Sequence, residues 1–358
     1  MRIITNYIRK KFLFIFSFLL ITIIMMFLVI DLVENLDKFI DKDVSYIIIA
    51  KYYMYYIPYI IILVLPMVTL MATVFSISSM AKNNEITALK ALGISMSTAM
   101  KTLLIMGVAI CIASFFIAEN VAISANRKMF LIKDTYLEKK QHSKTGMIRN
   151  IRIQEPPDKI VTIGIFDKSH DVARDVTVET FNGSRLVARM DAPYMEWNGT
   201  AWVVTKGMQR LFQKEEEFLT EIDKPLEFNF RFTPKQIELS QLKPDEMNFS
   251  ELIEFIKRIR ESGGETYHWL TDLHVRVSFP FSNIVIIFFS IPLVYNRRQK
   301  SFAAGFGISL IVSFIYFGLV KTGQTMGHKG TADPFIAAWI GNIVMIVSGI
   351  VFILKTRK

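Results

Sequence analysis

Residues 12–30 read FLFIFSFLLITIIMMFLVI, a run of nineteen positions without a charged side chain. A helix needs about 20 apolar residues to cross the roughly 30 Å hydrocarbon layer of a bilayer, so this stretch predicts a membrane-spanning helix. It follows the basic residues Arg9, Lys10 and Lys11 and runs into Asp31 without a small-residue cleavage site. We therefore expect a retained helix and not a secretory signal, with its N-terminal end in the cytoplasm.

Five more runs of comparable length follow the first. They cover residues 57–80, 99–118, 277–295, 302–320 and 335–354. Of the 358 residues, 52% are hydrophobic and only 21% are charged, which is too apolar for a soluble protein of this length. The sequence predicts a membrane α-helical protein with six transmembrane helices, arranged as three, a long insert and three more.

Orientation follows from the lysines and arginines of the short connections, which collect on the cytoplasmic side. With both termini inside, the inner segments hold Arg2, Arg9, Lys10, Lys11, Lys82, Lys90, Arg297, Arg298, Lys300, Lys355, Arg357 and Lys358. The short outer segments hold only Lys38, Lys42, Lys51, Lys321 and Lys329. The net charge of +10 is thus explained by topology and requires no nucleic acid partner.

The insert predicts an extracytoplasmic all-β domain. In residues 226–232, LEFNFRF, the side chains of Leu226, Phe228, Phe230 and Phe232 alternate onto one face of a strand. Similar runs occur at 159–166, 176–181, 185–190, 194–197 and 201–206, and the turn pairs Asn182-Gly183 and Asn198-Gly199 separate some of them. Short strands at this spacing indicate an antiparallel sandwich or open barrel.

The domain boundaries follow from these segments. Residues 1–124 hold the first three spans, 125–247 the β-domain, 248–264 a connecting helix and 265–358 the last three spans. The connecting helix is predicted by a capping box, in which Asn248 and Glu251 cap one another's backbone, and by a hydrophobic staple between Met247 and Leu252.

Few motifs for chemistry occur in the chain. There is no Gly-Lys-Ser/Thr phosphate loop, so ATP would have to bind another chain. The five histidines show no close pair suited to a metal, and His268 and His274 are expected to be solvated at the membrane surface. Cys111 has no partner for a disulfide. The sequence predicts no catalytic residue, no metal and no cofactor, and it disfavours a membrane-bound enzyme.

Residues 82–95, KNNEITALKALGIS, interrupt the apolar pattern between the second and third spans. Asn83 or Asn84 can cap a short helix over 83–93, Glu85 suits its first turn, and Gly93 can end it. An apolar stripe is formed by Ile86, Leu89 and Leu92. The stripe fits a helix that rests on lipid equally well as one that docks into a cytoplasmic partner.

The first spanning helix is predicted to continue past the lipid. Asp31, Glu34, Lys38 and Asp41 recur at helical spacing among apolar residues, with a possible ion pair between Glu34 and Lys38. A solvated helix end explains this pattern. A polar rim, where the head group of an amphiphile leaves the bilayer, is the alternative.

Several motifs together resemble the LptF/LptG permeases of lipopolysaccharide export. They are Pro66-Met67, Asn84 to Ser95, Ala192-Pro-Tyr-Met-Glu-Trp197 with Trp202, Pro244 to Leu252, Pro280, Ile291-Pro292-Leu293, Ala304 to Leu310 and Pro334 to Trp339. They span nearly the whole chain in order. The Trp197 to Trp202 region and the helix over 251–264 look more like the LptG branch than the LptF branch.

The resemblance implies a function and a set of partners. In this family two permeases form a heterodimer on a cytoplasmic dimer of LptB-like ATPases, extract lipopolysaccharide from the bacterial inner membrane and pass it to LptC/LptA-like periplasmic proteins. The helix after the second span would be the coupling helix, with Glu85 facing a basic residue of the ATPase and Ile86, Leu89 and Leu92 filling its groove. The insert would be a periplasmic β-jellyroll joined edge to edge with its neighbours.

Substrate contacts are less clear from the sequence. The inner faces of the first, second and fifth spans are expected to line the cavity, near Val64 and Lys38, with Gly305 and Gly307 allowing close helix approach. Where the family has basic residues, this chain has Asp31 and Glu34 and keeps only Lys38. Three explanations remain open: the other permease supplies the positive charge, the lipid carries fewer phosphates, or the substrate contacts lie elsewhere.

An alternative function is a mechanotransmitting subunit that relays ATPase strokes to a periplasmic partner without moving lipid.

Overall fold

The computed structural model describes residues 2–91, 96–137, 147–155, 158–183, 185–213, 216–239, 244–261, 265–295 and 302–356. The chain divides into two compact units. The first comprises Met1–Met129 with Tyr267–Lys358, and the second comprises Phe130–Thr266. The first unit holds the membrane helices and the second holds the β-domain, and each is described by itself.

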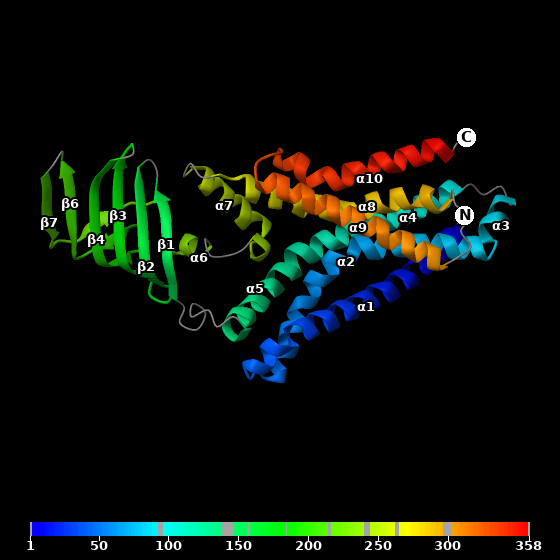
Figure 1. Cartoon of the computed structure of the whole chain (residues 1–358), viewed down its shortest axis with the longest axis horizontal. Coiled ribbons are helices and arrows are strands. Elements are labelled where there is room, and N and C mark those ends of the chain that lie inside the picture. The colour runs from blue at the N-terminus through cyan, green and yellow to red at the C-terminus, as the bar shows by residue number, and fades with distance from the viewer. Residues whose placement is uncertain are drawn as a thin grey trace. The chain divides into compact units, whose positions relative to one another are not determined.

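The helical unit contains the six predicted spans, all longer than the apolar runs alone (Figure 1). They are α1 (Arg2–Asp41), α2 (Tyr46–Lys82), α4 (Met96–Phe116), α8 (Tyr267–Tyr295), α9 (Phe302–His328) and α10 (Pro334–Thr356), with the short α3 (Glu85–Ala91) between α2 and α4. After α4 the chain stays helical through the π-helical η1 (Ile117–Ala122), α5 (Ile123–Ile132) and the π-helical η2 (Lys133–Leu137). The boundary predicted at residue 125 therefore falls inside this continuous helix.

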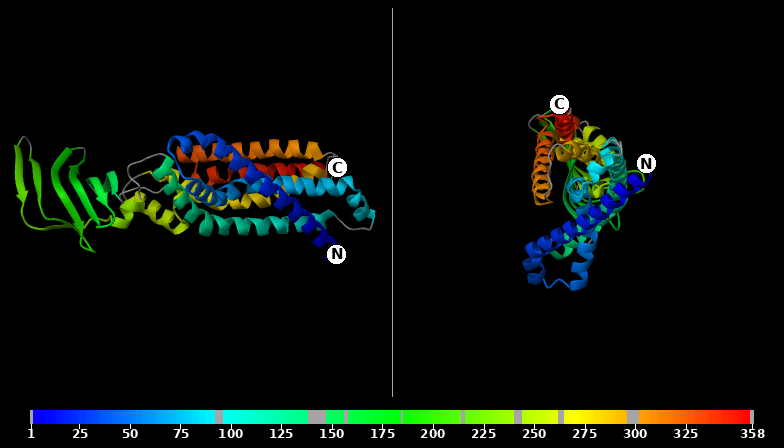
Figure 2. Two further views of the ribbon diagram at one scale, coloured as in Figure 1. Left: turned by 90° about the horizontal axis from the view of Figure 1, so that it is seen from below. Right: turned by 90° about the vertical axis from the view of Figure 1, so that its right-hand side faces the viewer.

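Helix α2 forms the centre of this unit. Its sequence is apolar on all sides, and it packs against α1, α8 and α9. Most of α2 from Val64 to Met80 is buried, whereas α1 and α9 leave long apolar faces exposed. The N- and C-terminal ends and α3 all lie at one end of the unit, and the α1–α2 connection lies at the other (Figures 1 and 2).

Polar side chains join helices inside the unit. Thr69 of α2 donates a hydrogen bond to Asn283 Oδ1 of α8 at 2.9 Å. Ser278 of α8 donates to the carbonyl of Ala338 on α10 at 2.8 Å, and Asn342 Nδ2 of α10 donates back to the Ser278 carbonyl at 2.8 Å. All of these side chains are buried, and such bonds hold helices together where the hydrophobic effect cannot distinguish lipid from protein.

The second unit contains one antiparallel sheet of eight strands. The strands are β1 (Met147–Glu155), β2 (Lys159–Asp167), β3 (Val172–Asn182), β4 (Arg185–Trp197), β5 (Trp202–Val204), β6 (Gly207–Gln213), β7 (Glu216–Ile222) and β8 (Leu226–Phe228). The order is β1-β2-β3-β4, and then the sheet divides. The C-terminal end of β4 pairs with β5 and through it β8, while its middle pairs with β6 and through it β7.

The two predicted hairpin turns are confirmed. Gly183, between β3 and β4, has φ +62°, and Gly199, between β4 and β5, has φ +99°. These backbone angles favour glycine because a Cβ atom would be strained there. The two runs predicted at 185–190 and 194–197 are one continuous strand, β4.

An aromatic core covers one part of this sheet. Trp202 is fully buried, and its indole N–H donates to the carbonyl of Phe232 at 2.8 Å. Phe228, Phe230 and Phe232 stack in sequence, with ring centroids 5.3 and 5.2 Å apart. The predicted shared face of these phenylalanines is therefore present, although only Leu226–Phe228 is paired as a strand. The short α6 (Pro234–Leu239) adds Ile237 to the same core.

The predicted capping box begins α7 (Phe249–Glu261), which follows the single turn η3 (Pro244–Glu246). The backbone N–H of Glu251 donates to Asn248 Oδ1, and the backbone N–H of Asn248 donates to Glu251 Oε2, both at 2.8 Å. Met247 and Leu252, the expected staple pair, are both fully buried.

Candidate functional site

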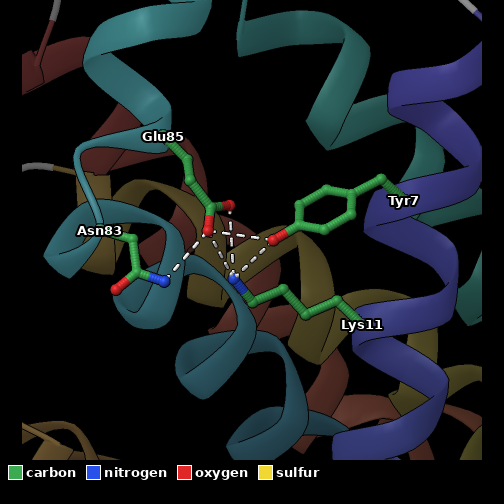
Figure 3. A network of polar contacts seen from close by, with 4 residues as sticks. All are labelled: Tyr7, Lys11, Asn83 and Glu85. Carbon is green, nitrogen blue, oxygen red and sulfur yellow. Dashed lines mark hydrogen bonds and ion pairs between the residues drawn. The ribbon is translucent and has the colours of Figure 1, made fainter.

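Two asparagines form the turn between α2 and α3. Asn83 follows the last turn of α2, and Asn84 has φ +57°, a left-handed conformation that asparagine tolerates better than most residues. The carbonyl of Asn84 then accepts the N–H of Ala88, the first bond of α3. This turn places Glu85, the first residue of α3, beside the N-terminal part of α1 (Figure 3).

Glu85 is the centre of a polar network (Figure 3). Its Oε1 accepts hydrogen bonds from Tyr7 Oη at 3.0 Å, Lys11 Nζ at 3.1 Å and Asn83 Nδ2 at 3.1 Å. Its Oε2 lies 3.3 Å from Lys11 Nζ. The side chain of Lys11 is 16% exposed and that of Glu85 is 25% exposed, so the ion pair is partly shielded from water. Glu85 was expected to face a basic residue of another protein. In the structure it pairs with a basic residue of its own chain, Lys11.

The environment of Glu85 favours its ionised form. Partial burial raises the pKa of the carboxyl, but the hydrogen bonds from Asn83, Lys11 and Tyr7, together with the charge of Lys11, outweigh it and lower the pKa overall. Glu85 is therefore a carboxylate at neutral pH. Three of its four contacts converge on Oε1, so Oε2 retains capacity to accept a further donor.

The apolar stripe of α3 faces inward. Ile86 and Leu89 are partly buried against the core of the helical unit. Thr87, Ala88 and Ala91 form the exposed side of the helix. Ile86 and Leu89 are thus only partly accessible, and the exposed positions described on α3 carry smaller residues. The predicted contacts Leu92 and Gly93 lie outside the described residues.

At the other end of α1, the predicted extension is present, since the helix continues to Asp41. Asp31 Oδ2 accepts a hydrogen bond from Tyr53 Oη of α2 at 3.0 Å. Lys38 Nζ donates to Asn35 Oδ1 at 2.9 Å and does not form the expected pair with Glu34. Glu34 and Lys38 are exposed, whereas Asp31 is bonded to the neighbouring helix.

The remaining substrate candidates differ in their surroundings. Val64 is only 2% exposed and lies in the core of the helical unit, so its side chain does not line an open surface in this structure. A Cβ atom at Gly305 would lie 3.2 Å from Val74 Cγ1, which agrees with the expected close approach of α9 to α2. At Gly307 a Cβ atom would meet nothing within 4 Å, so the close-approach role does not apply there.

Two groups of residues were not singled out from the sequence. Tyr7 and Lys11 were seen only as part of a basic N-terminal segment, and no local pattern links them to a residue more than 70 positions away. Tyr52, Tyr56 and Tyr59 form a ladder beside Asp31, with ring centroids 6.0 and 5.9 Å apart. The three tyrosines are four and three residues apart, a spacing that places them on one face of a helix and could have predicted the ladder.

Comparison with known proteins identifies one family. The family described as lipopolysaccharide export system permease LptF/LptG matches residues 6–355, nearly the whole chain. No curated protein matches the chain.

Proposed function

The chain belongs to the LptF/LptG family of lipopolysaccharide export permeases, a multi-pass inner-membrane family, and on this basis we propose that it is one membrane subunit of an ABC transporter. In this proposal it extracts lipopolysaccharide from the inner membrane together with a second LptF/LptG-type permease and passes it to periplasmic LptC/LptA-like proteins. The observation that carries the proposal is the family match over 6–355, on a chain with six apolar helices and an inserted β-domain. We assign it to the LptG-like branch on the sequence patterns at Trp197–Trp202 and 251–264.

The proposed topology places both termini and α3 in the cytoplasm and the β-domain in the periplasm. Six crossings return the chain to the side on which it began, and the two ends of the chain lie with α3 at one end of the helical unit. The excess of lysine and arginine in the segments at that end supports the cytoplasmic assignment.

We assign α3 as the contact with an LptB-like ATPase. In this proposal the ATPase subunit binds the ATP, and this chain does not. The exposed side of α3 carries Thr87, Ala88 and Ala91, small residues that permit close approach of a partner surface. Glu85 Oε2 already accepts a hydrogen bond from Lys11 at 3.3 Å and can accept a second one from a basic residue of the ATPase. Because Ile86 and Leu89 pack on the helical core, a displacement of α3 would be transmitted directly to the membrane helices.

The exposed apolar faces of α1 and α9 are the proposed surfaces for the second permease and for lipid acyl chains. On α1, large side chains such as Phe14, Phe18, Ile21 and Met25 are at least 60% exposed. On α9, Ile311 and Phe314 are similarly exposed. The sequence predicted that the first, second and fifth spans line the cavity. In the structure α2, the second span, is enclosed by its neighbours, so the proposed surface consists of α1 and α9.

Strand addition is the proposed mode of contact for the β-domain. Within the described residues, β1 pairs only with β2 and β7 pairs only with β6, so each has an unpaired edge. An unpaired edge offers a row of backbone donors and acceptors to a strand of another protein. A neighbouring periplasmic jellyroll is the expected partner.

Depletion of the protein in its native bacterium tests this function. We expect newly made lipopolysaccharide to accumulate in the inner membrane and to decline in the outer membrane. Normal outer-membrane lipopolysaccharide after depletion would contradict the proposal and would favour a subunit that relays mechanical strokes to a periplasmic partner.

A further inference from the structure

Two histidines and one aspartate meet where the start of α8 lies beside the end of α9. His328 Nε2 lies 2.8 Å from Asp272 Oδ1, and His268 Nδ1 lies 3.5 Å from Asp272 Oδ2. The two imidazole rings are stacked with centroids 3.9 Å apart. One ligand atom from each residue can be chosen so that all lie within 4.8 Å of one another. This group could not be predicted from the sequence, because His328 is 56 residues from Asp272.

The backbone around these residues is closely packed. A Cβ atom at Gly327 would lie 2.5 Å from Thr271 Oγ1, and one at Gly330 would lie 3.1 Å from the ring of Tyr267. Thr271 is fully buried, and its hydroxyl is bonded to the Tyr267 carbonyl at 2.7 Å. The glycines bring the two helix ends into contact, so the positions that carry His268, Asp272 and His328 are fixed by both helices.

The donor set is that of a transition-metal site. Two imidazole nitrogens and a carboxylate oxygen are common ligands of zinc, and three protein ligands leave a fourth position for water. Zinc ligands about 2.0–2.1 Å from the metal lie about 3.3 Å apart in a tetrahedron. The Asp–His separations of 2.8 and 3.5 Å involve different oxygens of the carboxylate, and the three ligand atoms lie within 4.8 Å of one another. Binding one metal would therefore require the stacked imidazole rings to turn toward a common point.

Exposure also suits metal entry from water. The side chain of His268 is 49% exposed, that of His328 27% and that of Asp272 16%. One ligand is therefore open to solvent, while the carboxylate is largely enclosed between the two helices. The His328–Asp272 contact is a hydrogen-bonded pair between the two helices, and the i,i+4 spacing of His268 and Asp272 on α8 adds a second imidazole at the other carboxylate oxygen.

We propose that His268, Asp272 and His328 bind a divalent transition metal, Zn²⁺ or its Co²⁺ substitute, and that the metal joins α8 to α9. This site goes beyond the transport function and does not depend on it. Its effect is to cross-link two membrane helices at the end of the unit opposite α3. Metal binding would stabilise this junction, because the ligands come from both helices.

The test uses the full-length chain, purified in detergent with any histidine tag removed and stripped of metal by a chelator. Co²⁺ is then added, because it shows visible d–d absorption in a tetrahedral site. We expect saturable binding of one Co²⁺ per chain, displaced by Zn²⁺. The variants Asp272→Asn and His328→Asn are each expected to weaken binding at least tenfold.

His274→Asn is the matched control. His274 lies on the same helix two residues beyond Asp272, but its ring packs edge-on against Phe335, outside the cluster. This variant is expected to bind Co²⁺ like the wild type. If His328→Asn or Asp272→Asn fails to fold, the more exposed His268→Asn provides the same comparison. Wild-type protein without tetrahedral Co²⁺ bands, or equal binding by the folded ligand variants, would overturn the proposal.

Discussion

Lys11 of α1 and Glu85 of α3 form an ion pair, with Nζ 3.1 Å from Oε1, across 74 residues of sequence. The pair ties the short helix between the second and third spans to the start of the first. Helix α3 is therefore held by its own chain through one polar anchor at Glu85 and through the apolar contacts of Ile86 and Leu89.

Removing the charge of Lys11 should loosen α3. A partly exposed ion pair contributes about 0.5–1 kcal/mol, so Lys11→Met is expected to speed amide hydrogen exchange in 85–91 by about two- to fivefold. The exposed neighbour Lys10 supplies the control, since Lys10→Met should leave exchange in α3 unchanged. Equal exchange in all three proteins would mean that the ion pair does not hold the helix.

The anchor should be insensitive to pH in the physiological range. The folded environment lowers the Glu85 pKa from its ordinary value of 4.5, so the contribution of the pair is complete above 4.5. It is lost as the pH falls through the lowered value, where the carboxylate becomes protonated. The exchange difference between Lys11→Met and wild type is therefore expected to be constant from about pH 8 to pH 5.5, after correction for intrinsic rates. A difference that fades over this range would show that Glu85 titrates higher.

The contact between α9 and α10 depends on Gly323. A Cβ atom there would clash with the carbonyl oxygen of Ala337, so Gly323→Ala should force the helices apart and cost about 1–3 kcal/mol. Gly318→Ala, on an open face of the same helix, should have no such cost. Thermal unfolding in detergent measures both variants, and a similar midpoint for the two would refute this packing.

The capping box at α7 gives a local stability prediction. Asn248→Ala removes the acceptor of the Glu251 N–H and is expected to cost about 1 kcal/mol, seen as faster exchange in the first turn of α7. Ser250→Ala changes an exposed residue in the same turn and should leave exchange unaltered. If both variants exchange alike, the cap does not stabilise the helix.

Local patterns predicted the features that depend on neighbouring residues. The six spans, the Asn248 capping box and the turns at Gly183 and Gly199 each need only a few adjacent side chains to specify them. Strands β1, β6 and β7 were not among the predicted runs, and in β1 the alternation is interrupted. Asn150 has φ +55°, and the buried residues Ile148 and Ile151 are three apart instead of two.

The contacts of the candidate site could not be predicted in the same way. The stripe of Ile86 and Leu89 was visible, but spacing alone does not tell which surface an apolar stripe meets. The partner of Glu85 lies on a helix that the fold brings back from the beginning of the chain. Both outcomes depend on tertiary packing, as does the meeting of His268 with His328.

Co-purification of the cytoplasmic ATPase with charge variants of this chain tests the central claim that α3 couples ATP hydrolysis to the membrane helices. Glu85→Lys should abolish co-purification, because it reverses the charge offered to the ATPase, whereas Lys11→Met removes the internal pair, keeps the carboxylate and should retain the ATPase. If folded Glu85→Lys protein co-purified with as much ATPase as the wild type, Glu85 would not be the coupling contact and the account would be contradicted.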